Sequence, residues 1–221
     1  MSFKKNKYIV VKKAISPQLA KFITQYFSLK RKVFRTLLDK KYLSQFTEEW
    51  GTWGDDVAAT SYCHYSDIAM ETLLTWVQPI MEKETGFKLH PTYTYTRFYQ
   101  KGDELVRHKD RFSCEISTTL RLGGDKWPIY LSPYENVGRV DGKKLTNRSE
   151  AKGVSIDLNL GDLLVYSGCE LEHWREPFQG ESCLQVFLHY NKANSKEAKE
   201  NEFDTRPHLG LPAWFKKRLS S

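Results

Sequence analysis

The sequence predicts a mainly β protein with supporting helices in its N-terminal part, an α+β arrangement in which the strands form a double-sheet barrel of the jelly-roll or cupin-like kind. Three observations lead to this prediction. Apolar residues recur at helical spacing within residues 1–88, and eight short alternating runs follow from residue 89 onward. Gly, Asp or Pro separates most of these runs. Eight strands are the number found in a jelly roll of two packed sheets.

The N-terminal part should contain one short strand and two helices. The run YIVV is the strand, and Ser16 and Pro17 supply an N-cap and a first-turn proline for a helix expected over residues 17–29. A second helix should begin after Ser66 and end at Gly86, because its apolar residues fall on one face. The segment EEWGTWGDD between the helices is expected to be a loop or lid.

Residues 89–191 form the predicted barrel core. Its eight strands are TYTYTRFY, ELVRHKD, EISTTLRL, WPIYLSP, VSIDLNL, DLLVYSG, LEHWREP and CLQVFLHYN. The polar stretch at 134–153, between the fourth and fifth strands, is expected to be an exposed insertion. Residues 192–221 begin charged and then carry enough apolar residues to pack back on the core. We therefore expect a single domain over residues 1–221.

Composition and charge narrow the class of protein. Of the 221 residues 40% are hydrophobic and 14% aromatic, as in folded globular proteins and unlike disordered chains. The net charge of +7 is spread along the chain, which favours a soluble basic surface over a nucleic-acid partner, because charge alone is blind to sequence. The four cysteines include no C-x-x-C pair. No apolar run approaches the roughly 20 residues of a membrane helix, so we predict a cytoplasmic protein with reduced thiols and no membrane contact.

The strongest candidates for chemistry are His108 and Asp110 in the run ELVRHKD. Residues two apart on a strand point to the same face, so one imidazole nitrogen and one carboxylate oxygen can bind a single ion. His173, in the late strand LEHWREP, is expected to lie beside the first strand and to offer a third ligand. Two histidines and one carboxylate that leave three positions open form the facial triad of non-haem Fe(II) oxygenases.

The same residues carry a resemblance to a known family. Tyr99, His108 and Asp110 are spaced as Y-x-x-G-x-x-x-x-x-H-x-D, and a Gly-Gly strand pair, GDLLVYSG and His173 follow. Over about residues 89–190 this pattern resembles the 2-oxoglutarate- and Fe(II)-dependent oxygenases of the prolyl 4-hydroxylase type. The resemblance implies a double-stranded β-helix in which His108, Asp110 and His173 hold the iron.

The sequence departs from that family at the residue that anchors the cosubstrate. Members usually place a Lys or Arg nine or ten residues after the second histidine, where this chain has Ser182 and Cys183. The distal carboxylate of 2-oxoglutarate needs a charged or multiply hydrogen-bonded partner once it is buried, and arginine binds it in bidentate fashion. Another cation must do this, or the cosubstrate differs.

Three arginines are candidates for the anchor. Arg121 takes about the position at which the family's Tyr-Leu-Asn strand offers a tyrosine to the same carboxylate. Arg175 follows His173 by two residues and so points the same way, about 6.5 to 7 Å further along the strand. Arg97 shares a face with Tyr99, which is itself expected to face the pocket and to hydrogen-bond the cosubstrate.

The resemblance also implies an activity. It is that of a dioxygenase using Fe(II), 2-oxoglutarate and O2, with ascorbate as an additional reductant, which hydroxylates a C–H bond and releases succinate and CO2. The expected substrate is a peptidyl residue such as proline, in a peptide or protein. The alternatives are a nucleic acid or a free amino acid as substrate, and a non-catalytic metal-binding β-barrel module. The oligomeric state stays open.

Other polar residues receive structural interpretations. His64 and Asp67 lie just before the second helix and are expected to help cap it. His189 is interpreted as out of phase with Phe187 on the last strand, and therefore as structural or near the mouth of the barrel.

Overall fold

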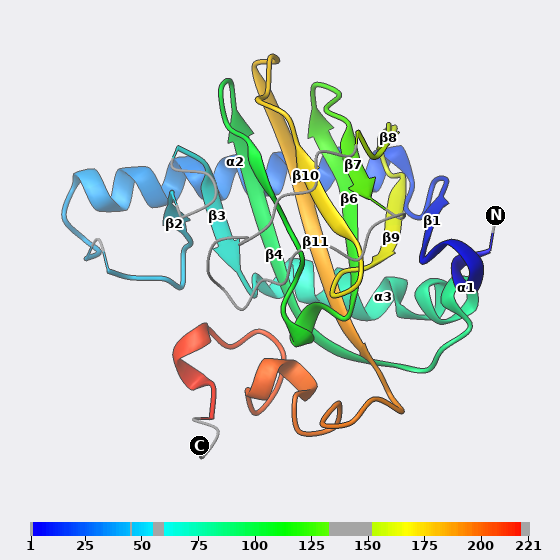
Figure 1. Ribbon diagram of the computed structural model, residues 1–221. Coiled ribbons are helices and arrows are strands. Elements are labelled where there is room, and N and C mark those ends of the chain that lie inside the picture. The colour runs from blue at the N-terminus through cyan, green and yellow to red at the C-terminus, as the bar shows by residue number, and fades with distance from the viewer. Residues whose placement is uncertain (1, 45, 55–59, 133–151, 218–221) are drawn as a thin grey trace.

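Two antiparallel sheets, of seven and four strands, face each other, and helices cover the outer face of the larger one (Figure 1). The computed structural model describes residues 2–44, 46–54, 60–132 and 152–217. The predicted insertion at 134–153 lies outside the described residues except for its last two. Among the helices described, none has the length and apolar character needed to cross a bilayer.

The first long helix, α2, starts where predicted but ends ten residues later. It spans Pro17–Asp39, and Ser16 caps it by accepting a hydrogen bond from the Leu19 backbone N–H at 3.1 Å. The predicted end at residue 29 was wrong because residues 30–39 contain no Gly or Pro to stop the helix, and Phe34 continues its buried face. Before it lie α1 (Phe3–Asn6) and the predicted strand β1 (Tyr8–Val11).

The second long helix, α3 (Ile68–Thr85), matches its predicted extent. Its N-cap is Asp67, one residue after the predicted Ser66, and the Asp67 carboxylate accepts hydrogen bonds from the backbone N–H groups of the first turn. Gly86 ends the helix in the left-handed conformation, with φ of 74°. Between the two long helices, the expected loop contains a short strand, β2 (Thr52–Trp53), which pairs with β3 (Tyr62–Tyr65).

All eight predicted core strands are present, and they confirm the predicted fold class. Their bounds are β4 Leu89–Gln100, β5 Leu105–His108, β6 Ile116–Gly124, β7 Ile129–Ser132, β8 Val154–Ile156, β9 Leu163–Ser167, β10 Glu172–Arg175 and β11 Ser182–Lys192. The larger sheet has the order β1-β9-β6-β11-β4-β3-β2, and the smaller has the order β5-β10-β7-β8. This alternation of strands between two antiparallel sheets is the double-stranded β-helix architecture.

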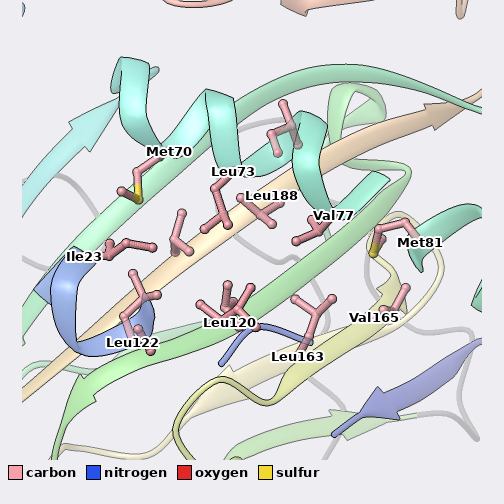
Figure 2. Packing of buried hydrophobic residues seen from close by; sticks show 14 of the residues in the cluster. Ile23, Met70, Leu73, Val77, Met81, Leu120, Leu122, Leu163, Val165 and Leu188 are labelled. Atoms are coloured by element: carbon pink, nitrogen blue, oxygen red, sulfur yellow. The ribbon is translucent and has the colours of Figure 1, made fainter. Parts of the chain in front are cut away.

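The two faces of the larger sheet differ in chemistry. On the outer face, Leu120 and Leu122 of β6 pack against apolar residues of α2 and α3 (Figure 2). Side chains alternate along a strand, so Ser117, Thr119 and Arg121 belong to the opposite face. The space between the sheets therefore receives polar groups from the same strand that builds the apolar core.

The C-terminal segment is tied to the body by buried charges. It includes two short 3-10 helices, η2 (Glu202–Thr205) and η3 (Ala213–Phe215). The Arg206 guanidinium donates to Glu71 Oε1 of α3 at 2.8 Å and to the Thr92 carbonyl of β4 at 3.0 Å. These bonds hold the segment against the end of the barrel.

Candidate metal centre

Three side chains predicted to bind a metal come together between the two sheets. His108 ends β5 and lies opposite His173 of β10 in the antiparallel pairing. Asp110 follows just beyond the end of β5, where its backbone N–H donates to the Gly168 carbonyl at 2.9 Å. Nε2 of each histidine lies 3.5 Å from Asp110 Oδ1, and one potential ligand atom from each of the three residues falls within 4.8 Å of the others.

Backbone carbonyls fix the orientation of both imidazole rings. His108 Nδ1 lies 2.6 Å from the Val106 carbonyl oxygen, and His173 Nδ1 lies 3.0 Å from that of Leu171. Because a carbonyl only accepts, each Nδ1 must carry a proton, so in a neutral ring the lone pair lies on Nε2, the nitrogen that faces Asp110. This is the tautomer that a metal-binding imidazole requires, with its second nitrogen held by an outer partner.

The charge states suit a cation. Burial, followed by the neighbouring His173, lowers the pKa of His108, so its ring is neutral at pH 7. Burial by itself would raise the pKa of Asp110, but the interactions with the neighbouring His173 and His108 outweigh it and hold this pKa well below its usual range. The site thus presents one anionic oxygen to an imidazole nitrogen of each histidine.

A cavity of about 160 Å³ opens beside these residues. Besides the three candidate ligands, it is lined by Tyr93, Tyr95, Arg97, Leu105, Tyr166, Phe187 and His189. Arg97 brings positive charge to this lining, and its guanidinium lies 5.0 Å from the Tyr95 ring centroid. Arg97 thus lies on the cavity wall, whereas Tyr99, which was expected to share its face, is not among the lining residues.

Arg175 lies deeper in the barrel and does not line this cavity. It is 2% exposed, and it donates to the Trp127 carbonyl and, at 3.2 Å, to Thr119 Oγ1. Its Nε is buried without a hydrogen-bond partner, and no carboxylate of the described residues forms an ion pair with it. Burial lowers the pKa of Arg175. A buried guanidinium with unused donor capacity is costly unless an anion completes it.

The other two predicted pocket residues have different surroundings. Tyr99 is fully buried beside Trp127, with ring centroids 4.8 Å apart, and burial raises its pKa to about 12 against the opposing charges of Arg97 and Arg175. Arg121 is partly exposed and donates to the Gly124 carbonyl at the end of its own strand. Tyr99 is thus near both Arg97 and Arg175, whereas Arg121 is partly exposed, and its Nε has no hydrogen-bond partner among the described residues. Neither Tyr99 nor Arg121 lines the cavity.

The predicted phase of His189 relative to Phe187 was wrong. Phe187 and His189 both line the cavity, because residues two apart on β11 face the same side of the sheet. The sequence reasoning also missed Ser117, whose hydroxyl donates to Asp110 Oδ2 at 2.7 Å. Its signal was the same two-residue spacing, which places Ser117 and Thr119 on the inner face of β6.

No protein-family model matches the chain, and no curated protein matches it. Solved structures do match. A Pseudomonas putida prolyl-4-hydroxylase is 14% identical, with a TM-score of 0.56 over 87% of this chain and 96% of that one. The epimerase SnoN from nogalamycin biosynthesis, in complex with Fe3+, alpha ketoglutarate and nogalamycin RO, is 13% identical, with a TM-score of 0.60 over 86% and 81%. The alpha-ketoglutarate-dependent carbocyclase SnoK is 12% identical, with a TM-score of 0.58 over 95% and 90%.

The chain has the fold of these three proteins. At such low identities the similarity concerns the fold alone, and the three proteins carry names for three different reactions. A shared fold does not fix the reaction or the substrate, so function must be argued from the site.

Proposed function

We propose that this protein is an Fe(II)- and 2-oxoglutarate-dependent dioxygenase in which His108, Asp110 and His173 bind the iron. The observation that carries the proposal is the convergence of two Nε2 atoms on Asp110 Oδ1 at 3.5 Å, inside a barrel of oxygenase fold. Two imidazoles and one carboxylate are a donor set that suits Fe(II) and leaves coordination positions open. Bound iron supplies the activation of O2 and the oxidation of 2-oxoglutarate.

The residues of this chain orient the metal and keep it accessible. The Val106 and Leu171 carbonyls hold both imidazoles in the required tautomer before any metal arrives. The aromatic walls of the cavity, including Tyr95 and Phe187, limit the water that can reach the site. These features support a site that positions a cosubstrate rather than a closed structural metal site.

For the cosubstrate we propose Arg175 as the partner of the distal carboxylate. Support comes from its burial, the unpartnered Nε and the absence of a paired acid among the described residues. The neighbouring Thr119 and Tyr99 hydroxyls offer further hydrogen bonds to the same group. Arg97, on the cavity wall, adds attraction for a dianion, while Arg121 is partly exposed, unlike the fully buried Arg175. An arginine–carboxylate bond of this kind is charge-assisted and strong.

For the substrate we propose a peptidyl residue such as proline. The similarity of fold to a prolyl-4-hydroxylase supports this class, as does the sequence pattern around Tyr99. The assay described next separates this class from nucleic acids and free amino acids.

The test is succinate formation by anaerobically purified protein supplied with Fe(II), 2-oxoglutarate, ascorbate and air. We expect turnover by the wild type, a rise with proline-containing peptides rather than with methylated oligonucleotides or free amino acids, and loss of at least 100-fold in Asp110→Ala. The control is Asp157→Ala, an exposed acid outside the site. If the wild type neither turns over nor binds 2-oxoglutarate in the presence of Fe(II), the protein is a metal-binding module and not an enzyme of this class.

A further inference from the structure

The two oxygens of the Asp110 carboxylate have separate surroundings. Oδ1 faces the two histidine Nε2 atoms, whereas Oδ2 accepts a hydrogen bond from Ser117 Oγ at 2.7 Å. A carboxylate can rotate about its terminal torsion. The group that engages Oδ2 therefore determines which lone pairs of Oδ1 face the histidines.

The donors and acceptors around Ser117 define the direction of each hydrogen bond. Ser117 Oγ also lies 2.9 Å from the Cys114 carbonyl oxygen and 3.0 Å from His189 Nδ1. Asp110 Oδ2 and the Cys114 carbonyl are both acceptors, so the single hydroxyl proton must serve them. The lone pairs of Oγ are then left for a donor, and His189 Nδ1–H is the donor in reach.

His189 is suited to hold that proton in one tautomer. Its ring is buried and packs against the tilted ring of Tyr93 with centroids 4.6 Å apart, and burial lowers its pKa to about 4. The ring is therefore neutral at pH 7 and carries one N–H, which the contact with Ser117 places on Nδ1. Hydrogen bonds thus run from His189 to Ser117 and from Ser117 to Asp110.

Gly168 leaves room for this arrangement. A Cβ atom at residue 168 would lie 2.4 Å from Asp110 Oδ2, 2.7 Å from Ser117 Oγ and 2.3 Å from the Cys114 carbonyl oxygen. These distances are far shorter than any van der Waals contact. Only glycine lets the carboxylate and the hydroxyl meet here.

We infer that Ser117 and His189 are positioning residues, which hold the Asp110 carboxylate so that Oδ1 is presented to a metal bound by His108 and His173. The inference rests on the proposed metal site and adds an outer layer to it, made by β6 and β11 of the larger sheet. Outer partners of this kind typically change metal affinity by about 10- to 100-fold.

The test measures metal binding directly, by anaerobic titration with Fe(II) and by the visible absorption of the Co(II)-loaded protein. We expect Ser117→Ala to weaken Fe(II) binding by about 10-fold or more and to shift the Co(II) bands, because the freed carboxylate changes its coordination. His189→Leu removes the donor and should weaken binding by a smaller factor. His189→Asn places an amide N–H near the position of Nδ1 and should restore binding toward the wild-type value.

Ser132→Ala is the matched control, since Ser132 is equally buried on β7 and its hydroxyl has no hydrogen-bond partner among the residues described. It should leave the affinity and the Co(II) bands unchanged. If Ser117→Ala binds both metals like the wild type while Asp110→Ala binds neither, the inference is overturned and the metal site stands. If the wild type binds neither metal, the metal site itself is overturned. Thermal melting of each variant identifies any loss that comes from unfolding.

Discussion

Two arginines of this protein are almost equally buried but have opposite surroundings. Arg206 is 3% exposed, and its guanidinium donates to the Glu71 carboxylate and to the carbonyls of Phe203, Thr92 and Leu211. Arg175 is 2% exposed and has only the Trp127 carbonyl and the Thr119 hydroxyl as acceptors. Arg206 therefore has a carboxylate and several carbonyls of its own chain as acceptors, whereas Arg175 has no carboxylate partner among the described residues.

The difference supports a structural role for Arg206 and the proposed binding role for Arg175. Burying a charge costs several kcal/mol unless a countercharge and hydrogen bonds offset it, and Glu71 supplies both to Arg206. Nothing in the described part of the chain supplies a countercharge to Arg175. A buried cation that lacks one, near a candidate metal site, is what an anionic cosubstrate requires.

The largest effect should come from breaking the ion pair between Arg206 and Glu71. Arg206→Met leaves Glu71 buried without its cation, so we expect the free energy of unfolding to fall by about 3–5 kcal/mol. Urea denaturation measures this, and the double variant Arg206→Met/Glu71→Met should recover part of the loss. A decrease below about 1 kcal/mol would show that the bonds of Arg206 do not hold the C-terminal segment.

Substitution of Arg175, the cation without a countercharge, should affect cosubstrate binding rather than stability. Arg175→Gln removes the proposed anchor, a charge-assisted bond worth about 1.5–3 kcal/mol, so we expect the KM for 2-oxoglutarate to rise by roughly 10- to 100-fold. Stability should change little, because the substitution also removes an uncompensated buried charge. Arg121→Gln is the control and should leave the KM within about twofold, since Arg121 is engaged outside the cavity. An unchanged KM in Arg175→Gln, together with a raised KM in Arg97→Gln, would identify Arg97 on the cavity wall as the anchor.

Much of the candidate site could be predicted because strand geometry is local. The two-residue spacing of His108 and Asp110 sets their common direction, and the same spacing after His173 sends Arg175 into the barrel. The eight-strand pattern then brings β5 beside β10, as the pairing of His108 with His173 shows. The alternation of side chains along a strand thus predicts the face on which each residue lies, and the error on His189 came from assigning it to the wrong face.

The rest depends on contacts that no local pattern encodes. Arg206 meets Glu71 across 135 positions, and that meeting depends on the path of the C-terminal segment. The closeness of Gly168 to Asp110 depends on how the turn after β9 packs under the end of β5. The late end of α2 depends on the burial of Phe34 against Tyr62, with ring centroids 6.1 Å apart. Each is set by tertiary packing rather than by spacing.

Two carboxylates, those of Asp204 and Asp110, also differ in their surroundings. Substitution of Asp204 gives the smallest effect that we predict. Asp204 is buried and accepts hydrogen bonds from both Nη atoms of Arg111, at 2.7 and 2.8 Å, from Lys216 Nζ at 2.7 Å and from the Tyr65 hydroxyl at 2.7 Å. Burial alone would raise the pKa of Asp204, but the bonds from Arg111 and the charges of Arg111 and Lys216 outweigh it and hold this pKa well below the usual range. Asp204 thus accepts hydrogen bonds from an arginine and a lysine, whereas the side chains beside the Asp110 carboxylate are two histidines and the Ser117 hydroxyl.

A depressed carboxyl pKa has a definite sign in the pH dependence of stability. The contribution of Asp204 is fully present above the unfolded-state pKa of about 3.9, and it is lost as the pH falls through the lower pKa of the folded state. Asp204→Asn should cost about 1–2 kcal/mol at pH 7, less than for Arg206 because Arg111 and Lys216 are partly exposed and regain water. The gap between variant and wild type should then shrink from pH 4 downward in urea denaturation. Asp39→Asn, in an exposed pair with Arg35, should show no such gap. A gap for Asp204→Asn that stayed constant down to pH 2 would mean that its charge contributes nothing and that the packing of its side chain accounts for the loss.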